Sequence, residues 1–184
     1  MSNLARLPPF LDEPKTSRGD HAVRCVVESP MGSATKFKYD AETKTFQLHR
    51  PLIKGLTYPF DWGFIPSTLA PDGDPLDAMV LHDAPGFPGL VIAAQLIGVL
   101  EVEQRVGDRK ERNDRLFAVP VEAPREDGID DVLDLPKRLR KELESFFLAT
   151  AALEEKELRF LGWKGPKEAR ALLEHAIARH EHKR

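Results

Sequence analysis

The segment Asp72-Gly73-Asp74-Pro75-Leu76-Asp77 places three carboxylates within six residues, and the apolar run Ala78-Met79-Val80-Leu81 follows it. Gly73 allows a backbone angle that is closed to other residues, and Pro75 fixes its own φ, so the segment can direct its carboxylates at one point. Carboxylate oxygens are the ligands that Mg²⁺ prefers, although a surface turn can have the same composition. A calcium-binding loop of the helix-loop-helix type is excluded, because it requires Gly at its sixth position, where this chain has Asp77.

The overall composition indicates a single globular domain. The chain has 184 residues, of which 41% are hydrophobic. This length supports one sizeable core. The net charge of -3 results from 27 basic and 30 acidic residues that are mixed along the sequence, and this balance argues against a nucleic-acid partner.

Two features indicate the cellular compartment. Cys25 is the only cysteine, which excludes an internal disulfide and suits a reducing environment. The longest apolar stretch, Leu90 to Leu100, is interrupted by Gln95 and is too short to span a bilayer. We therefore expect a cytoplasmic protein without membrane association.

The beginning of the chain differs in pattern from the rest. Residues 1–20 contain Pro8, Pro9 and Pro14 among charged residues, which is typical of an extended arm. From residue 21 onward apolar residues alternate with polar ones, as expected of strands. The alternating positions are Val23, Cys25, Val27, Phe37, Tyr39, Phe46 and Leu48, with further strands predicted at 78–82, 90–104 and 115–120. We expect one domain over residues 21–184, with a mostly antiparallel sheet that is closed or strongly curled.

After Pro120 the apolar residues recur at helical spacing. Asp134 and Pro136 suit the N-cap and first turn of one helix, and a second helix is predicted to begin at Pro166. The apolar faces comprise Leu135, Leu139, Leu143, Phe146 and Phe147 in the first helix and Ala169, Leu172, Leu173, Ala176 and Ile177 in the second. We expect both helices to pack on the sheet.

The segment Asp72–Ala78 resembles the signature of the soluble family I inorganic pyrophosphatases, without a mismatch. Its surroundings agree, since the family has similar segments at Tyr58-Pro59, Trp62–Thr68, Gly98-Val99-Leu100 and Ala118-Val119-Pro120. The likeness extends from about Val23 to Trp163. It implies a mainly β fold of the α+β class: a small closed antiparallel β-barrel, similar to the OB fold, with two main C-terminal helices packed on it. The family also often forms homo-oligomers.

The chemistry that the resemblance implies is Mg²⁺-dependent hydrolysis of inorganic diphosphate to two phosphates, with Mn²⁺ as a possible substitute cofactor. By resemblance, Asp72, Asp77 and Glu28 bind metal. Asp74 orients and deprotonates the nucleophilic water, and Tyr58 places a phenol near the site.

The basic residues of the site are also implied by the resemblance. Lys36, Arg50 and Arg115 match the positions that hold phosphate oxygens. Arg115 stands where Lys is usual, which keeps the charge and adds a planar fork of donors.

Several positions differ from the family pattern. Gln104 and Asn113 stand where the family has two further metal-binding aspartates, and Lys38 stands where an acidic residue is usual. An amide offers a neutral oxygen without the charge that attracts Mg²⁺. A register shift could bring a nearby acid into the site, because a displacement of one residue sends a side chain to the opposite face of a strand. The candidates are Glu103, Asp108, Glu111 and Asp114.

Two further differences concern the substrate. Thr150-Ala151 stands where the family has a Tyr-Lys pair, and Trp62 replaces a common Tyr. Two interpretations therefore remain open. The protein is a diphosphate hydrolase with reduced or altered activity, or it is a catalytically inactive pyrophosphatase-like protein that binds a phosphorylated ligand.

Overall fold

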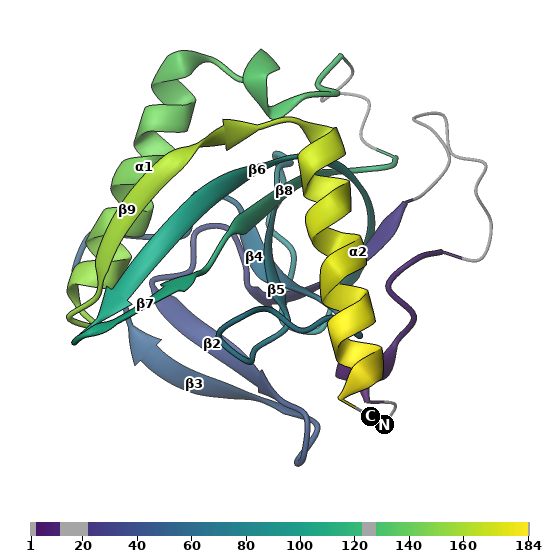
Figure 1. Ribbon diagram of the computed structural model, residues 1–184. Coiled ribbons are helices and arrows are strands. Elements are labelled where there is room, and N and C mark those ends of the chain that lie inside the picture. Colours follow the sequence, from purple (N-terminus) through teal and green to yellow (C-terminus); the bar gives the residue numbers. More distant parts are fainter. Residues whose placement is uncertain (1–2, 12–21, 123–127, 184) are drawn as a thin grey trace.

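A closed ring of five strands forms the centre of the fold. The computed structural model (Figure 1) describes residues 3–11, 22–122 and 128–183. Its elements in chain order are η1 (Leu4–Arg6), β1 (Val23–Ser29), β2 (Thr35–Asp40), β3 (Thr45–Pro51), β4 (Asp61–Ile65), β5 (Leu76–Val80), β6 (Val91–Val106), β7 (Arg109–Arg112), β8 (Arg115–Pro120), η3 (Val132–Asp134), α1 (Lys137–Ala152), β9 (Glu157–Lys164) and α2 (Pro166–His182).

The ring closes in the order β1-β4-β5-β8-β6, and β6 pairs back with β1. Four of these pairings are antiparallel, and the pairing of β5 with β8 is parallel. Strands β2 and β3 form a separate antiparallel hairpin. The prediction of a mainly β fold with a closed, mostly antiparallel sheet is confirmed.

Strand β6 connects the whole sheet. Its 16 residues pair successively with β1, β8, β9 and β7. Gly98 lies at an irregularity of this strand, and a Cβ there would overlap the side chain of Val132 and the carbonyl oxygen of Lys164. The close approach of three segments therefore explains why a glycine occupies this position.

The two helices cover different parts of the sheet. Phe117 and Val119 of β8 belong to the same cluster as Phe146 and Phe147 of α1, whereas the alternate residues Leu116 and Ala118 belong to the cluster that includes α2. Because successive side chains of a strand point to opposite faces, one strand supports both clusters. Figure 1 shows α1 beside β9, and α2 across β6 and β8. The predicted packing of both helices on the sheet is confirmed.

The predicted N-cap at Asp134 is wrong. Asp134 instead ends η3, where it forms a capping box with Asp131. Helix α1 begins at Lys137 after Pro136, without a side-chain cap. A residue that precedes proline is disfavoured in the helical region, and Leu135 accordingly has an extended ψ of 139°. This residue separates η3 from α1.

Three strands were not predicted from the sequence. Strand β4 has every residue buried, so it lacks a polar alternation. Strand β7 has the sequence RKER and gives no apolar signal. Strand β9 alternates but follows directly after a helical pattern. Each of these segments forms a strand because it pairs with a neighbour: β4 pairs with β1 and β5, and β7 and β9 both pair with β6.

The described part of the N-terminal segment contacts the barrel. Residues Leu4–Arg6 form one 3₁₀ turn, and Phe10 forms an isolated bridge with Val23. The Ser67 hydroxyl donates to the carbonyl of Leu7 over 2.9 Å. Residues 12–20 of the predicted arm lie outside the described ranges. Among the residues that are described, no helix is long and apolar enough to cross a membrane.

Candidate active site

The aspartate loop ends at the start of β5. Gly73 has φ of +92°, the left-handed region predicted for it, and the Asp74 N–H donates to Asp72 Oδ1 over 3.2 Å. The Leu76 N–H donates to Thr68 Oγ1 over 2.9 Å, which fixes where the strand begins. Asp77 therefore lies on a strand, while Asp72 and Asp74 lie on the turn before it.

A fourth carboxylate approaches from β1. Glu28 accepts the Tyr39 N–H over 2.7 Å and is only 8% exposed. Burial raises the pKa of Glu28 to about 7. The hydrogen bond from Tyr39 acts to lower this pKa, and the charge of Asp77 acts to raise it. Burial also raises the pKa of Asp72, with added repulsion from Asp77 and Asp74. Burial is the main cause of both shifts and the neighbouring carboxylates add to it, so a bound cation would stabilise the ionised forms.

Two of the loop carboxylates contact basic side chains. Lys38 Nζ lies 2.8 Å from Asp74 Oδ2. Burial lowers the pKa of Lys38, but the hydrogen bond and charge of Asp74 outweigh it and leave the pKa raised. Arg115 forms a salt bridge with Asp77. Lysine at position 38 is thus a direct partner of the carboxylate predicted to handle the nucleophilic water.

Arg115 is held between polar and aromatic groups. Its guanidinium lies 5.5 Å from the centroid of the Trp62 ring and 6.0 Å from that of Phe147, and it donates to Asn113 Oδ1. A guanidinium stacks on aromatic faces better than an ammonium, and Trp is the best ring for this contact. The two differences from the family pattern, Arg115 and Trp62, therefore stabilise each other.

The basic residues of the β2–β3 hairpin share one carboxylate. Arg50 donates through Nε and Nη2 to Glu154 Oε1, over 2.9 and 2.7 Å. Lys36 Nζ lies 3.4 Å from the same oxygen, and Lys156 Nζ lies 2.6 Å from Glu154 Oε2. Glu154 thus gathers its near neighbour Lys156 and two cations that are distant in sequence, Lys36 and Arg50.

The structure decides which residues of β6 to β8 face the site. Gln104 and Asn113 are buried, and the Asn113 amide donates to Gln104 Oε1 over 2.9 Å. Asp114 faces away: its Oδ1 accepts the Val102 N–H over 2.8 Å and it pairs with Arg112. A register shift that would bring Asp114 into the site is not found: Asn113 and Asp114 connect β7 to β8, and the hydrogen bond from Val102 holds the Asp114 carboxylate away from the pocket. Glu103 pairs with Lys110.

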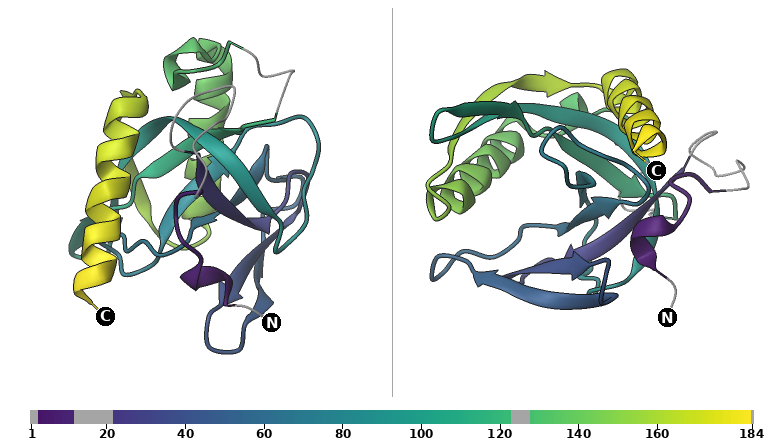
Figure 2. Two further views of the ribbon diagram at one scale, coloured as in Figure 1. Left: turned by 90° about the vertical axis from the view of Figure 1, so that its right-hand side faces the viewer. Right: turned by 60° about the horizontal axis from the view of Figure 1, so that its bottom comes forward.

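One pocket brings these groups together. Its lining includes every predicted site residue except Asp114, namely Glu28, Lys36, Lys38, Arg50, Tyr58, Asp72, Asp74, Asp77, Gln104, Asn113 and Arg115. The cavity volume of about 230 Å³ suits a compact ligand. Figure 2 shows the hairpin β2–β3 on the opposite side of the barrel opening from α1, and both contribute to the lining.

Two of the cationic residues that line the pocket carry buried donors without acceptors. Within the described ranges, Arg50 Nη1 and Arg115 Nε are buried and have no hydrogen-bond partner. Tyr58 is 4% exposed, and burial raises its pKa, so the phenol stays protonated as a donor. Unsatisfied cationic donors are costly in a protein interior, and phosphate oxygens would supply the missing acceptors.

The donor set suits a hard divalent cation in its chemistry, because Glu28, Asp72, Asp74 and Asp77 all offer carboxylate oxygens. In the described part of the chain, no group of three His, Cys, Asp or Glu side chains is close enough to hold a metal as positioned. Lys38 and Arg115 neutralise Asp74 and Asp77 instead. A metal ion at Asp77 would compete with Arg115 for this carboxylate.

Sequence reasoning missed three residues of the pocket: His49, Glu154 and Lys156. Burial lowers the pKa of His49, with the charge of Lys36 acting in the same direction. Glu154 and Lys156 follow the end of α1, where the resemblance drew attention to Thr150-Ala151 instead. Charged residues after a helix are usually solvated, so no local signal marked them.

Comparison with known proteins identifies the family of this chain. The family model described as Inorganic pyrophosphatase matches residues 25–181. An inorganic pyrophosphatase of Synechocystis is 37% identical over 175 residues, covering 95% of this chain and 97% of the relative, and one of Methanosarcina mazei is 39% identical over 162 residues, covering 88% and 94%. The crystal structure of inorganic pyrophosphatase from Thermus thermophilus superposes with a TM-score of 0.86 at 35% identity, covering 98% of this chain and 99% of that one. The chain therefore belongs to the inorganic pyrophosphatase family.

Proposed function

We propose that this protein hydrolyses inorganic diphosphate to two phosphates with Mg²⁺ as its cofactor. The observation that carries the proposal is that one pocket collects the complete aspartate loop and the cations Lys36, Arg50 and Arg115. Negative groups that suit a metal and positive groups that suit phosphate line the same pocket. A diphosphate with its bound cations needs both kinds of contact.

The carboxylates Asp72, Asp77 and Glu28 would hold Mg²⁺, or Mn²⁺ in its place, because their oxygens are its preferred ligands. When bound, such an ion lowers the pKa of a coordinated water and neutralises charge on the phosphoryl oxygens. Glu28 and Asp72 are buried beside other carboxylates, which raises their pKa values. This supports the assignment, because a bound cation would stabilise their ionised forms.

The reaction itself requires a proton acceptor beside the attacking water. Asp74 suits this role because its side chain is 55% exposed and lies at the pocket. As the water oxygen bonds to one phosphorus atom, Asp74 accepts its proton, the bridging P–O bond breaks, and the leaving phosphate takes the electron pair. Lys36, Arg50 and Arg115 stabilise the developing negative charge, and Tyr58 donates a hydrogen bond.

The amides Gln104 and Asn113 make the pocket less negative than two aspartates would. Their mutual hydrogen bond occupies one donor and one acceptor that face the site. We expect a weaker attraction for divalent cations than two carboxylates would give. We therefore expect the protein to need a higher Mg²⁺ concentration for activity than it would with two aspartates at these positions.

The decisive experiment is phosphate release from diphosphate across titrations of Mg²⁺ and Mn²⁺. Asp72→Ala serves as the inactive background, and Asp108→Asn, an exposed residue outside the pocket, serves as the matched control. We expect metal-dependent release that is lost in Asp72→Ala and kept in Asp108→Asn. No release above the background, together with diphosphate binding in calorimetry, would support the phosphorylated-ligand binder instead.

We also propose a cytoplasmic location and a homo-oligomeric state. The single cysteine, Cys25, is buried and free, which suits a reducing compartment. Large apolar side chains such as Leu48 and Phe87 are 68% and 61% exposed and are available to an interface. Light scattering coupled to size-exclusion chromatography would contradict the oligomer if it gave the mass of one chain.

A further inference from the structure

Lys156 is a basic residue of the pocket to which the proposed mechanism gives no role. The pocket is lined on one side by residues of α1, of β9 and of the turn between them. These residues are Phe146, Phe147, Thr150, Ala151, Glu154, Lys156 and Leu158. Among these residues, all within the part of the chain that the structure describes, Lys156 is the only one with a positive charge. It is therefore the only group of this wall that could attract an anion electrostatically.

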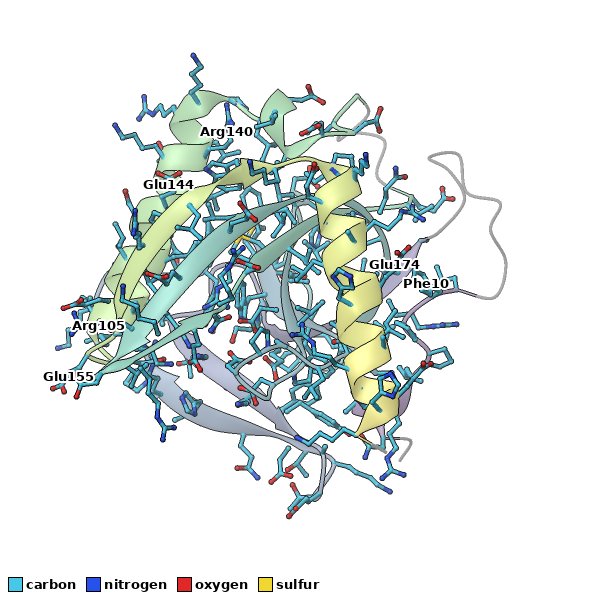
Figure 3. All side chains as sticks on the ribbon, in the orientation of Figure 1. Phe10, Arg105, Arg140, Glu144, Glu155 and Glu174 are labelled. Carbon is cyan, nitrogen blue, oxygen red and sulfur yellow. The ribbon has the colours of Figure 1, made fainter. Side chains whose placement is uncertain are left out.

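The backbone of the turn determines where Lys156 lies. The N–H groups of Glu154 and Lys156 both donate to the carbonyl of Ala151, over 2.9 and 3.2 Å. Glu155 between them has φ of +54°, a left-handed conformation that reverses the chain at the end of a helix. The reversal brings Lys156 back beside Ala151. Figure 3 shows Glu155 at the outer tip of this turn, pointing away from the molecule.

The Lys156 ammonium is directed by Glu154. Its Nζ lies 2.6 Å from Glu154 Oε2, while Oε1 of the same carboxylate contacts Arg50 and Lys36. The three cations therefore surround one carboxylate. The Lys156 side chain remains 30% exposed, so a ligand in the pocket can reach it. An ammonium has three donors, and the contact to Glu154 uses one of them, so the group keeps capacity for a phosphate oxygen.

We propose that Lys156 is a further diphosphate-binding residue, which contributes positive charge from the α1 side of the pocket. This inference rests on the proposed function. Lys36 and Arg50 approach a ligand from the hairpin β2–β3, and Arg115 approaches it from β8. Lys156 adds contact from the wall that otherwise offers Phe146, Phe147 and small residues.

The test compares Lys156→Met with Lys141→Met, a matched change at an exposed lysine of α1 that lies outside the pocket. We expect Lys156→Met to raise KM for diphosphate about tenfold, as loss of one charge-assisted contact would do. Lys141→Met keeps the KM of the unaltered protein. Lys156→Arg retains most of the affinity because it keeps the charge.

A relocated lysine provides a second measurement. Because Lys156 lies beside Ala151, the double variant Ala151→Lys with Lys156→Met restores a cation to the same wall, and we expect it to recover most of the lost affinity. A destabilised protein would not recover in this way. An unchanged KM in Lys156→Met, or equal losses in Lys156→Met and Lys141→Met, would overturn the proposal.

Calorimetry separates this inference from the proposed function. If the unaltered protein releases no phosphate, the function fails, yet the diphosphate Kd of Lys156→Met can still be compared with that of Lys141→Met. A Kd about tenfold weaker supports the role of Lys156 in binding. Equal Kd values overturn it whether or not the protein is an enzyme.

Discussion

Replacing Glu154 with Gln removes the carboxylate that gathers Lys36, Arg50 and Lys156. Glutamine is nearly the same size and keeps one oxygen, so the change tests the charge rather than the packing. Burial by itself would raise the pKa of Glu154, but the hydrogen bond from Lys156, the charge of Lys36 and the hydrogen bond from Arg50 lower it to about 2. The folded protein therefore strongly prefers the ionised carboxylate.

The size of the effect follows from this pKa. The difference between the ordinary value of 4.5 and the value of about 2 corresponds to about 3.4 kcal/mol, because one pKa unit corresponds to about 1.36 kcal/mol. The Glu154 side chain is 18% exposed, so water screens part of the interaction. We expect Glu154→Gln to lower the free energy of unfolding at pH 7 by about 2 kcal/mol.

The dependence on pH identifies the cause. Because the pKa of Glu154 is lower in the folded state than in the unfolded state, its contribution is complete above about pH 4.5 and declines as the pH falls toward 2. We expect the difference in stability between the unaltered protein and Glu154→Gln to shrink to about half by pH 3. Urea unfolding followed by circular dichroism, from pH 7 to pH 3, measures both quantities.

Glu155→Gln is the control, because Glu155 is the exposed neighbour of Glu154 and points away from the molecule (Figure 3). We expect it to change stability by less than about 0.5 kcal/mol. The reasoning would be refuted if Glu154→Gln were as stable as the unaltered protein at pH 7. A deficit that stayed constant from pH 7 to pH 3 would also refute it, since it would point to packing rather than charge.

Three further predictions concern the site. Asp74→Asn should reduce kcat at least about a hundredfold, because it removes the proton acceptor. Calorimetry should show a diphosphate affinity within about threefold of that of the unaltered protein. A turnover equal to that of the unaltered protein would contradict the role of Asp74. Replacing both Gln104 and Asn113 with Asp should lower the Mg²⁺ concentration for half-maximal phosphate release, since it adds two negative charges that face the pocket. An unchanged Mg²⁺ titration would contradict the placement of these two residues. Asp114→Asn should leave that Mg²⁺ concentration unchanged but lower the melting temperature, because it removes the charge that pairs with Arg112 away from the pocket. A shifted Mg²⁺ titration would show that Asp114 acts in the site.

The sequence was most informative where the pattern is local. Gly73 has the left-handed φ that its turn requires, and β8 spans the predicted residues 115–120. The buried faces of α1 and α2 follow the predicted helical spacing, except that Leu135, predicted for the first helix, lies before α1 as the C-cap of η3. These features depend on the preferences of neighbouring residues, which an alternating or helical pattern records directly.

Local sequence patterns did not predict the structure where local preference competes with tertiary contacts. Asp134 satisfies the pattern of an N-cap, yet the extended conformation before Pro136 places it at the end of η3. Strand β7 has no apolar alternation and forms because it pairs with β6. In both cases the decisive interaction comes from a conformational restriction or a partner strand that residue type alone does not specify.

By itself the sequence determined the chemistry available to this protein: an aspartate loop that suits a divalent cation, and basic residues that suit phosphate. Only the tertiary structure decided that Gln104 and Asn113 face the pocket while Asp114 faces away, because the pairing of β6 with β7 and β8 positions the connection that carries Asn113 and Asp114. It also decided that Glu154 meets Arg50, 104 residues earlier in the chain. No pattern of neighbouring residues encodes such a contact, since chain folding brings the two charges together and burial then makes their pairing strong.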